Sequence, residues 1–127
     1  MKQKILLVED NENNRYLAQF LLEREGFVVR IAVNGRQALQ LAKQEKPDLV
    51  VMDIQMPEMD GYETATQLKN DPELAEIPLV GVSSFAMPGD RAKAIKMGFA
   101  GYIEKPINPE TFGQEAKAFL NGVAKHA

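Results

Sequence analysis

Short apolar runs recur along the chain, separated by longer stretches in which apolar and polar residues alternate with helical spacing. The runs occupy residues 5–8, 28–32, 49–52, 79–82 and 102–103. Each has the length of a buried strand, and Leu6-Leu7-Val8 is apolar without the strict alternation of a half-exposed strand. Near-continuous apolar strands are typical of parallel sheets that are covered on both faces. The pattern therefore predicts five strands of one parallel sheet.

The stretches between these runs predict helices. Asn34-Gly35 and Asn108-Pro109 are typical helix entries, and Gly26 and Gly98 suit helix exits. The apolar residues with helical spacing are Leu17, Leu21 and Leu22; Ala38, Leu41 and Ala42; Ala65 and Leu68; Ala94, Ile95 and Met97; and, over a last helix at about 109–123, Phe112, Ala116, Phe119, Leu120 and Val123. Strands and helices that alternate in this way predict a (βα)5 chain, flavodoxin-like, folded as a three-layer α/β/α sandwich.

Composition restricts the function classes. With 127 residues and 45% hydrophobic content, the chain suits one domain at residues 1–123, followed by a polar tail at 124–127. There is no cysteine, so a thiolate metal site is excluded. The net charge of −3 and the absence of a basic run give no reason to expect nucleic acid or membrane binding. We expect a cytoplasmic protein that is a monomer or a weak dimer.

Polar residues gather where the predicted strands end. They are Glu9-Asp10 after the first strand, Asp53 after the third, Ser83-Ser84 after the fourth and Glu104-Lys105-Pro106 after the fifth. Ligands of open α/β sheets bind outside the carboxyl ends of the strands. The sequence therefore predicts a site in which several carboxylates and one ammonium lie close together.

Crowded carboxylates repel one another, and a hard dication relieves that repulsion. Asp10 and Asp53 suit Mg²⁺, with Glu9 bound directly or through water. A metal that shields an incoming phosphoryl group would allow the Asp53 carboxylate to act as a nucleophile. Lys105 would neutralise one phosphoryl oxygen and the Ser83 hydroxyl would hydrogen-bond another.

Each of these residues also has an ordinary interpretation. Asp53 alone is as readily a turn residue, Glu9-Asp10 a helix cap, Ser83 a loop serine and Lys105 a solvated surface lysine. Their coincidence at successive strand ends favours the chemical interpretation.

The sequence resembles the response-regulator receiver family over essentially the whole chain. The resemblance rests on ILLVEDN (5–11), PDLVVMDIQMPEMDGYE (47–63), IPLVGVSS (77–84) and GYIEKPI (101–107). It implies that Asp53 is the phosphoacceptor, that the Gln55 backbone carbonyl joins Asp10 and Asp53 on magnesium, and that a cis Lys105-Pro106 peptide positions the lysine. It also implies a switch in which Ser83 is drawn toward the phosphoryl group and Tyr102 rotates inward.

The resemblance further implies partners. A histidine kinase or histidine phosphotransfer protein would supply the phosphoryl group and dock on Asn14, Tyr16 and Leu17 with the 106–107 loop. A downstream protein would bind the face formed by the fourth helix, fifth strand and fifth helix, where we expect Arg91, Ile95, Tyr102 and Phe112. With no second domain predicted, the chain resembles a single-domain regulator whose only chemistry is its own phosphorylation and dephosphorylation.

Other functions fit less well. A haloacid-dehalogenase-like phosphatase needs a second aspartate two residues after the nucleophile, where this chain has Gln55. A flavodoxin-like FMN carrier needs a Ser, Thr and Gly-rich phosphate loop, and the acidic Glu9 to Glu12 segment would repel phosphate. A degenerate receiver that is not phosphorylated is disfavoured by the presence of all five expected site residues, Glu9, Asp10, Asp53, Ser83 and Lys105. His126, the only histidine, lies in the tail, and the methionines at 52, 56 and 59 suit packing.

Overall fold

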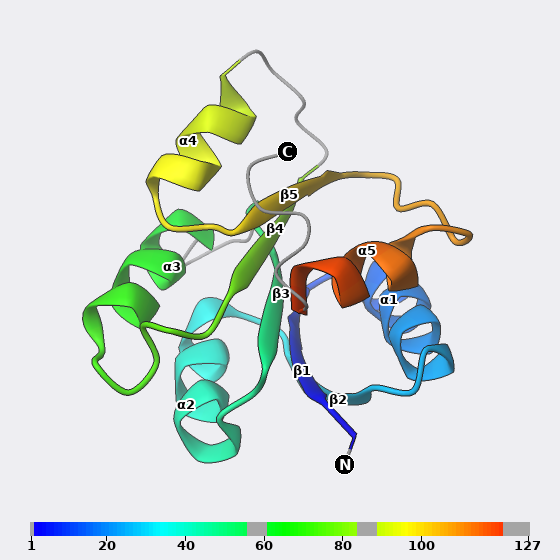
Figure 1. Cartoon of the computed structure of the whole chain (residues 1–127), viewed down its shortest axis with the longest axis horizontal. Coiled ribbons are helices and arrows are strands. Elements are labelled where there is room, and N and C mark those ends of the chain that lie inside the picture. Colours follow the sequence, from blue (N-terminus) through cyan, green and yellow to red (C-terminus); the bar gives the residue numbers. More distant parts are fainter. Residues whose placement is uncertain (1, 56–60, 84–88, 121–127) are drawn as a thin grey trace.

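The computed structural model describes residues 2–55, 61–83 and 89–120. In these segments five parallel strands form one sheet in the order β2-β1-β3-β4-β5, with helices on both sides (Figure 1). The elements are β1 (Lys4–Val8), α1 (Glu12–Arg24), β2 (Val28–Ala32), α2 (Gly35–Glu45), β3 (Leu49–Asp53), α3 (Gly61–Asn70), β4 (Leu79–Ser83), α4 (Asp90–Lys96), β5 (Gly101–Glu104) and α5 (Phe112–Leu120). The predicted three-layer (βα)5 architecture is confirmed.

Alternate residues of the strands enter two separate cores. Leu6 and Val8 of β1 pack with residues of α2, α3 and α4, whereas Ile5 and Leu7 pack with residues of α1 and α5. Successive side chains of a strand point to opposite faces of the sheet, so a strand between two helical layers must be apolar throughout. This explains why β1 and β3 have near-continuous apolar sequences.

The helix entries are only partly as predicted. Asn34 caps α2, since its side chain accepts a hydrogen bond from Gln37 N at 2.8 Å. The prediction that α5 begins at Pro109 is wrong, because the helix begins at Phe112. Asn108 still caps the turn that leads into α5, since its side chain accepts from Glu110 N at 2.9 Å and its carbonyl accepts from Phe112 N at 2.9 Å. The Pro109 carbonyl accepts from the Arg24 guanidinium at 3.0 Å.

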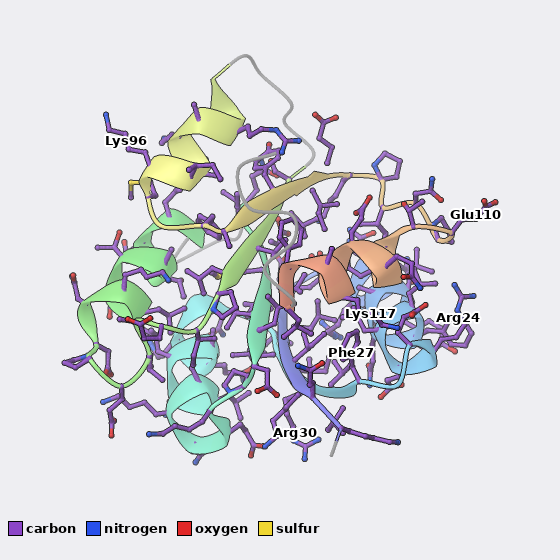
Figure 2. The ribbon with its side chains drawn as sticks, viewed as in Figure 1. Arg24, Phe27, Arg30, Lys96, Glu110 and Lys117 are labelled. Carbon is purple, nitrogen blue, oxygen red and sulfur yellow. The ribbon has the colours of Figure 1, made fainter. Side chains whose placement is uncertain are left out.

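Two further contacts join α1 to α5. Glu25, at the C-terminal cap of α1, pairs with Lys117 of α5 at 3.1 Å and accepts from Gln114 at 3.0 Å. Figure 2 shows Arg24 and Lys117 on these adjacent helices. The end of α1 is thereby fixed to α5 and to the loop that precedes it.

Among the described residues, the helices are too short or too polar to cross a membrane. The predicted domain end at 123 and the tail at 124–127 lie outside the described residues, so these boundaries stay predictions.

Candidate functional site

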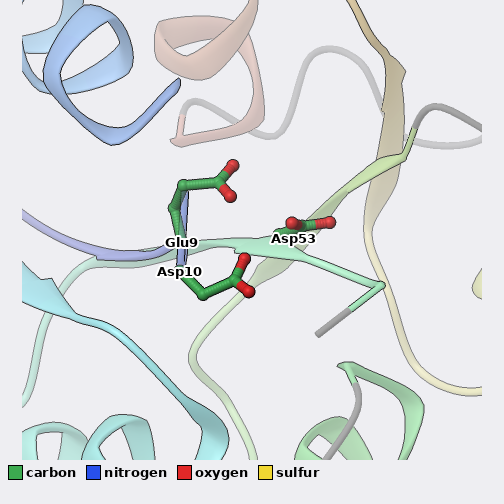
Figure 3. Close-up of side chains that lie close together, drawn as sticks. All are labelled: Glu9, Asp10 and Asp53. Carbon is green, nitrogen blue, oxygen red and sulfur yellow. The ribbon is translucent and has the colours of Figure 1, made fainter. Parts of the chain in front are cut away.

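The sheet order brings the predicted acidic residues together. β1 and β3 are neighbours with Val8 opposite Met52, so Glu9 and Asp10 leave β1 beside Asp53 at the end of β3. Figure 3 shows the three carboxylates facing a common space, and one oxygen from each lies within 4.8 Å of the others. Glu9 and Asp53 are each 5% exposed, and Asp10 is exposed. The site is therefore a partly buried acidic cluster with one open side.

The start of α3 is held against this cluster. A Cβ atom on Gly61 would lie 2.6 Å from Ile54 Cα, and the Gly61 N–H donates to the Ile54 carbonyl at 2.9 Å. Only glycine permits so close an approach of two backbones. The residue after Asp53 is therefore fixed by packing on α3.

Lys105 reaches the cluster from the loop after β5. Its Nζ lies 3.0 Å from Glu9 Oε1 and 3.2 Å from Asp53 Oδ2, and its side chain is 16% exposed. Its backbone N–H donates to the Ser83 carbonyl at 2.8 Å, and the Lys105-Pro106 peptide is cis, as the resemblance implies. Lys105 is therefore an ion-pair partner of two buried carboxylates, not a solvated surface lysine.

The charges perturb one another. Burial, and then the negative charge of Asp53, raise the pKa of Glu9 to about 7, although Lys105 counteracts part of this effect. Burial disfavours the charged form of Lys105, but Glu9 and Asp53 outweigh it and raise the pKa of the ammonium above its ordinary value. Glu9 thus has the raised proton affinity expected of crowded carboxylates, and Lys105 stays charged.

Gln55 and Ser83 complete the buried edge of the site. The Gln55 backbone N–H donates to Asp53 Oδ1 at 3.0 Å, and its side-chain Nε2 donates to Ser83 Oγ. Ser83 is 2% exposed. The sequence placed Ser83 at this edge but contained no signal for the contact between the two side chains.

Tyr102 is 5% exposed and packs in the core on the α4 side, with the Arg91 guanidinium 5.7 Å from its ring centroid. Arg91 is exposed and Ile95 is half-buried, as suits a binding face. Tyr102 and Phe112 are both buried, so neither is exposed on the face that was predicted to have them on or near it. Phe112 is 1% exposed, because it belongs to the apolar stripe of α5 that packs toward α1.

The predicted donor surface on α1 is exposed, and it consists of the polar Asn14 and the apolar side chains of Tyr16 and Leu17. Tyr16 is 73% and Leu17 37% exposed. The sequence prediction missed Phe20, which is 53% exposed one helical turn after Tyr16 and whose spacing from Tyr16 was the available signal. A cavity of about 260 Å³ runs from Asp53 and Lys105 to Leu17 and Ile107. The cavity thus connects the predicted docking residues Asn14, Leu17 and Ile107 with the acidic cluster.

Several predicted positions lie outside the described residues. They are Ser84, Met56, Met59 and His126.

The fold and the acidic edge can now be compared with known proteins. The family model described as the response regulator receiver domain matches residues 5–117. The chain belongs to this family. Receiver proteins that it resembles include the polar-differentiation response regulator DivK of Brucella anthropi, with 42% identity over 94% of this chain and 98% of the relative, and DivK of Brucella ovis, with 41% identity over the same shares.

Solved receiver structures superpose closely on this chain. The chemotaxis response regulator CheY4 of Vibrio cholerae gives a TM-score of 0.86 at 26% identity over 92% of this chain and 98% of that one. The receiver domain of sensor histidine kinase PA1611 from Pseudomonas aeruginosa, determined with a magnesium ion coordinated in the active site cleft, gives 0.86 at 26% identity over 95% and 99%. This receiver is therefore a two-component signalling domain with the fold of CheY-like regulators.

Proposed function

We propose that this receiver accepts a phosphoryl group on Asp53 from a phosphohistidine donor, in a magnesium-dependent reaction, and acts as a single-domain regulator. The observation that carries the proposal is the Lys105 ammonium, which lies 3.0 Å from Glu9 and 3.2 Å from Asp53 within a buried acidic cluster. A nucleophilic carboxylate beside a fixed cation can receive a highly charged group whose oxygens that cation then neutralises.

In the reaction, a carboxylate oxygen of Asp53 forms a bond to phosphorus while the bond from phosphorus to the donor imidazole nitrogen breaks. The electron pair of the broken bond stays on that nitrogen, and Asp53 becomes an acyl phosphate. Lys105 neutralises one phosphoryl oxygen and Ser83 donates a hydrogen bond to another. Tyr102 reports the change, since it belongs to β5 and packs in the core on the α4 side, with Arg91 over its ring.

The residues present fit a magnesium ion. Mg²⁺ prefers oxygen ligands and usually takes one or two carboxylates with waters and phosphate oxygens. Asp10, Asp53 and the Gln55 backbone carbonyl would hold it, with Glu9 acting through water. When bound, the ion supplies charge that offsets repulsion between Asp53 and the phosphoryl group. The magnesium in the cleft of the related Pseudomonas receiver supports this assignment.

We further propose how the signal enters and leaves. The histidine kinase or phosphotransfer protein docks on the exposed residues Tyr16, Leu17 and Phe20 of α1 and on the 106–107 loop, next to the cavity that reaches Asp53. The downstream protein binds the face made by α4, β5 and α5. The coverage of 98% of the Brucella anthropi relative supports a receiver that works as a single domain. We also propose that it works in the cytoplasm as a monomer or weak dimer. It acts on itself and not on an external substrate.

The test is incubation with acetyl phosphate and magnesium, followed by mass spectrometry of the intact chain and its peptides. One phosphoryl group on Asp53 is the expected product, and it should be absent from Asp53→Asn and after chelation of magnesium. Asp48→Asn is the matched control, because Asp48 is exposed just before the opposite end of β3 and should leave labelling unchanged. Labelling that persists in Asp53→Asn would refute the proposal.

A further inference from the structure

Gln55 contacts both the proposed phosphoacceptor and the proposed switch residue. Its backbone N–H donates to Asp53 Oδ1 at 3.0 Å, and its side-chain amide donates to Ser83 Oγ. The sheet makes this placement possible. β3 and β4 run in parallel with Asp53 opposite Val82, and the Ile54 N–H still donates to the Val82 carbonyl at 3.0 Å. Gln55 therefore lies alongside Ser83, where the two strands end.

We propose that Gln55 is a positioning residue that acts through Ser83. Its side-chain amide holds the Ser83 hydroxyl in the unphosphorylated chain and releases it when Asp53 carries a phosphoryl group. The inference rests on the proposed function, to which it adds a residue that sets the balance between the two states of the switch.

The physical basis is competition for one hydroxyl group. Ser83 is 2% exposed, so bulk water does not readily replace a lost partner. A serine side chain occupies one staggered rotamer at a time, and turning toward Asp53 removes its oxygen from the Gln55 amide. Anionic phosphoryl oxygens are stronger acceptors than neutral groups, so a phosphoryl group on Asp53 can win this competition. The Gln55 bond should disfavour the switched form by about fivefold, the usual worth of one neutral hydrogen bond.

The test uses Gln55→Leu, which keeps a side chain of similar size and the backbone carbonyl but removes the amide donor. The probe is beryllium trifluoride with magnesium, a phosphoryl mimic that bonds to a carboxylate oxygen, and its affinity is measured by fluorine NMR. Gln55→Leu should bind the probe about fivefold more tightly than the parent chain. In a Ser83→Ala background the same substitution should have no effect, and in Ser83→Thr, which keeps the hydroxyl, the effect should return.

A second readout examines the unliganded protein. Three-bond proton couplings of Ser83 should report one dominant rotamer in the parent chain and a different distribution of rotamers in Gln55→Leu. Unchanged couplings, unchanged probe affinity, or an equal effect in Ser83→Ala would each overturn the role of Gln55 while leaving phosphorylation of Asp53 intact. A parent chain that forms no adduct on Asp53 would overturn the proposed function and this inference together.

Discussion

Glu9 should make the stability of the folded chain depend on pH. Burial and the Asp53 charge raise its pKa from the ordinary 4.5 to about 7. A carboxyl group that binds its proton more tightly in the folded chain stabilises the fold below its unfolded pKa, and that stability is lost as the pH rises through the folded pKa. A change from 4.5 to about 7 corresponds to about 3 kcal/mol. Stability should therefore fall by that amount between about pH 5 and 8.

The substitution Glu9→Gln removes the titrating group and keeps an oxygen that can accept from Lys105 and from Asn11 N, the present partners of Glu9. Its free energy of unfolding should vary less with pH, so that its difference from the parent chain changes by about 3 kcal/mol across the range. Urea unfolding followed by circular dichroism, with a chelator present, measures this difference.

The control is Glu110→Gln, because Glu110 is exposed in the loop before α5 and lies at the edge of the molecule in Figure 2. The free energy of unfolding of Glu110→Gln should vary with pH in the same way as that of the parent chain. Magnesium should stabilise the parent chain most above pH 7, where Glu9 is ionised. Parallel pH profiles for the parent chain and Glu9→Gln would refute the reasoning.

Three other outcomes are expected. Lys105→Met leaves two buried carboxylates without their cation and should lower the free energy of unfolding in urea by about 3 kcal/mol at pH 8. The loss should be smaller near pH 5, where Glu9 is protonated, and an equal loss at the two pH values would contradict the ion-pair argument. Gly61→Ala forces a methyl group against Ile54 Cα and should lower the free energy of unfolding by about 2 kcal/mol in thermal or urea unfolding. An unchanged melting temperature would show that α3 can move away from Ile54 without cost. Phe20→Ala should slow phosphotransfer from a histidine donor protein about tenfold but leave labelling by acetyl phosphate unchanged, and slower labelling by both donors would argue against a docking role.

The strands could be predicted from the sequence because both sheet faces are covered by helices, which leaves long apolar runs such as Leu49 to Met52. The acidic edge was also predictable, since parallel strands bring their carboxyl ends to one side and Asp53 directly follows such a run. The start of α5 was predicted three residues too early, and the contact between the Pro109 carbonyl and Arg24, 85 positions earlier, could not be predicted at all. A distant side chain of this kind leaves no local signal.

The side-chain contacts within the site could not be predicted from the sequence, for a related reason. That Lys105 contacts both Glu9 and Asp53, and Gln55 contacts Ser83, depends on strand register and rotamers that no spacing rule specifies. Phe112 shows the converse error. Its helical spacing with Ala116 was recognised. Periodicity alone, however, does not say whether the apolar residues at the start of a helix pack on the sheet or face a partner protein.

The contacts between α1 and α5 give the molecule a mechanical property. Arg24 donates to the Pro109 carbonyl and Glu25 pairs with Lys117, so the last turn of α1 is joined to the loop that follows Lys105 and to α5. A partner that tilts α1 would therefore also strain this loop. The two contacts give a partner bound to α1 a physical connection to the backbone next to the Lys105 ammonium.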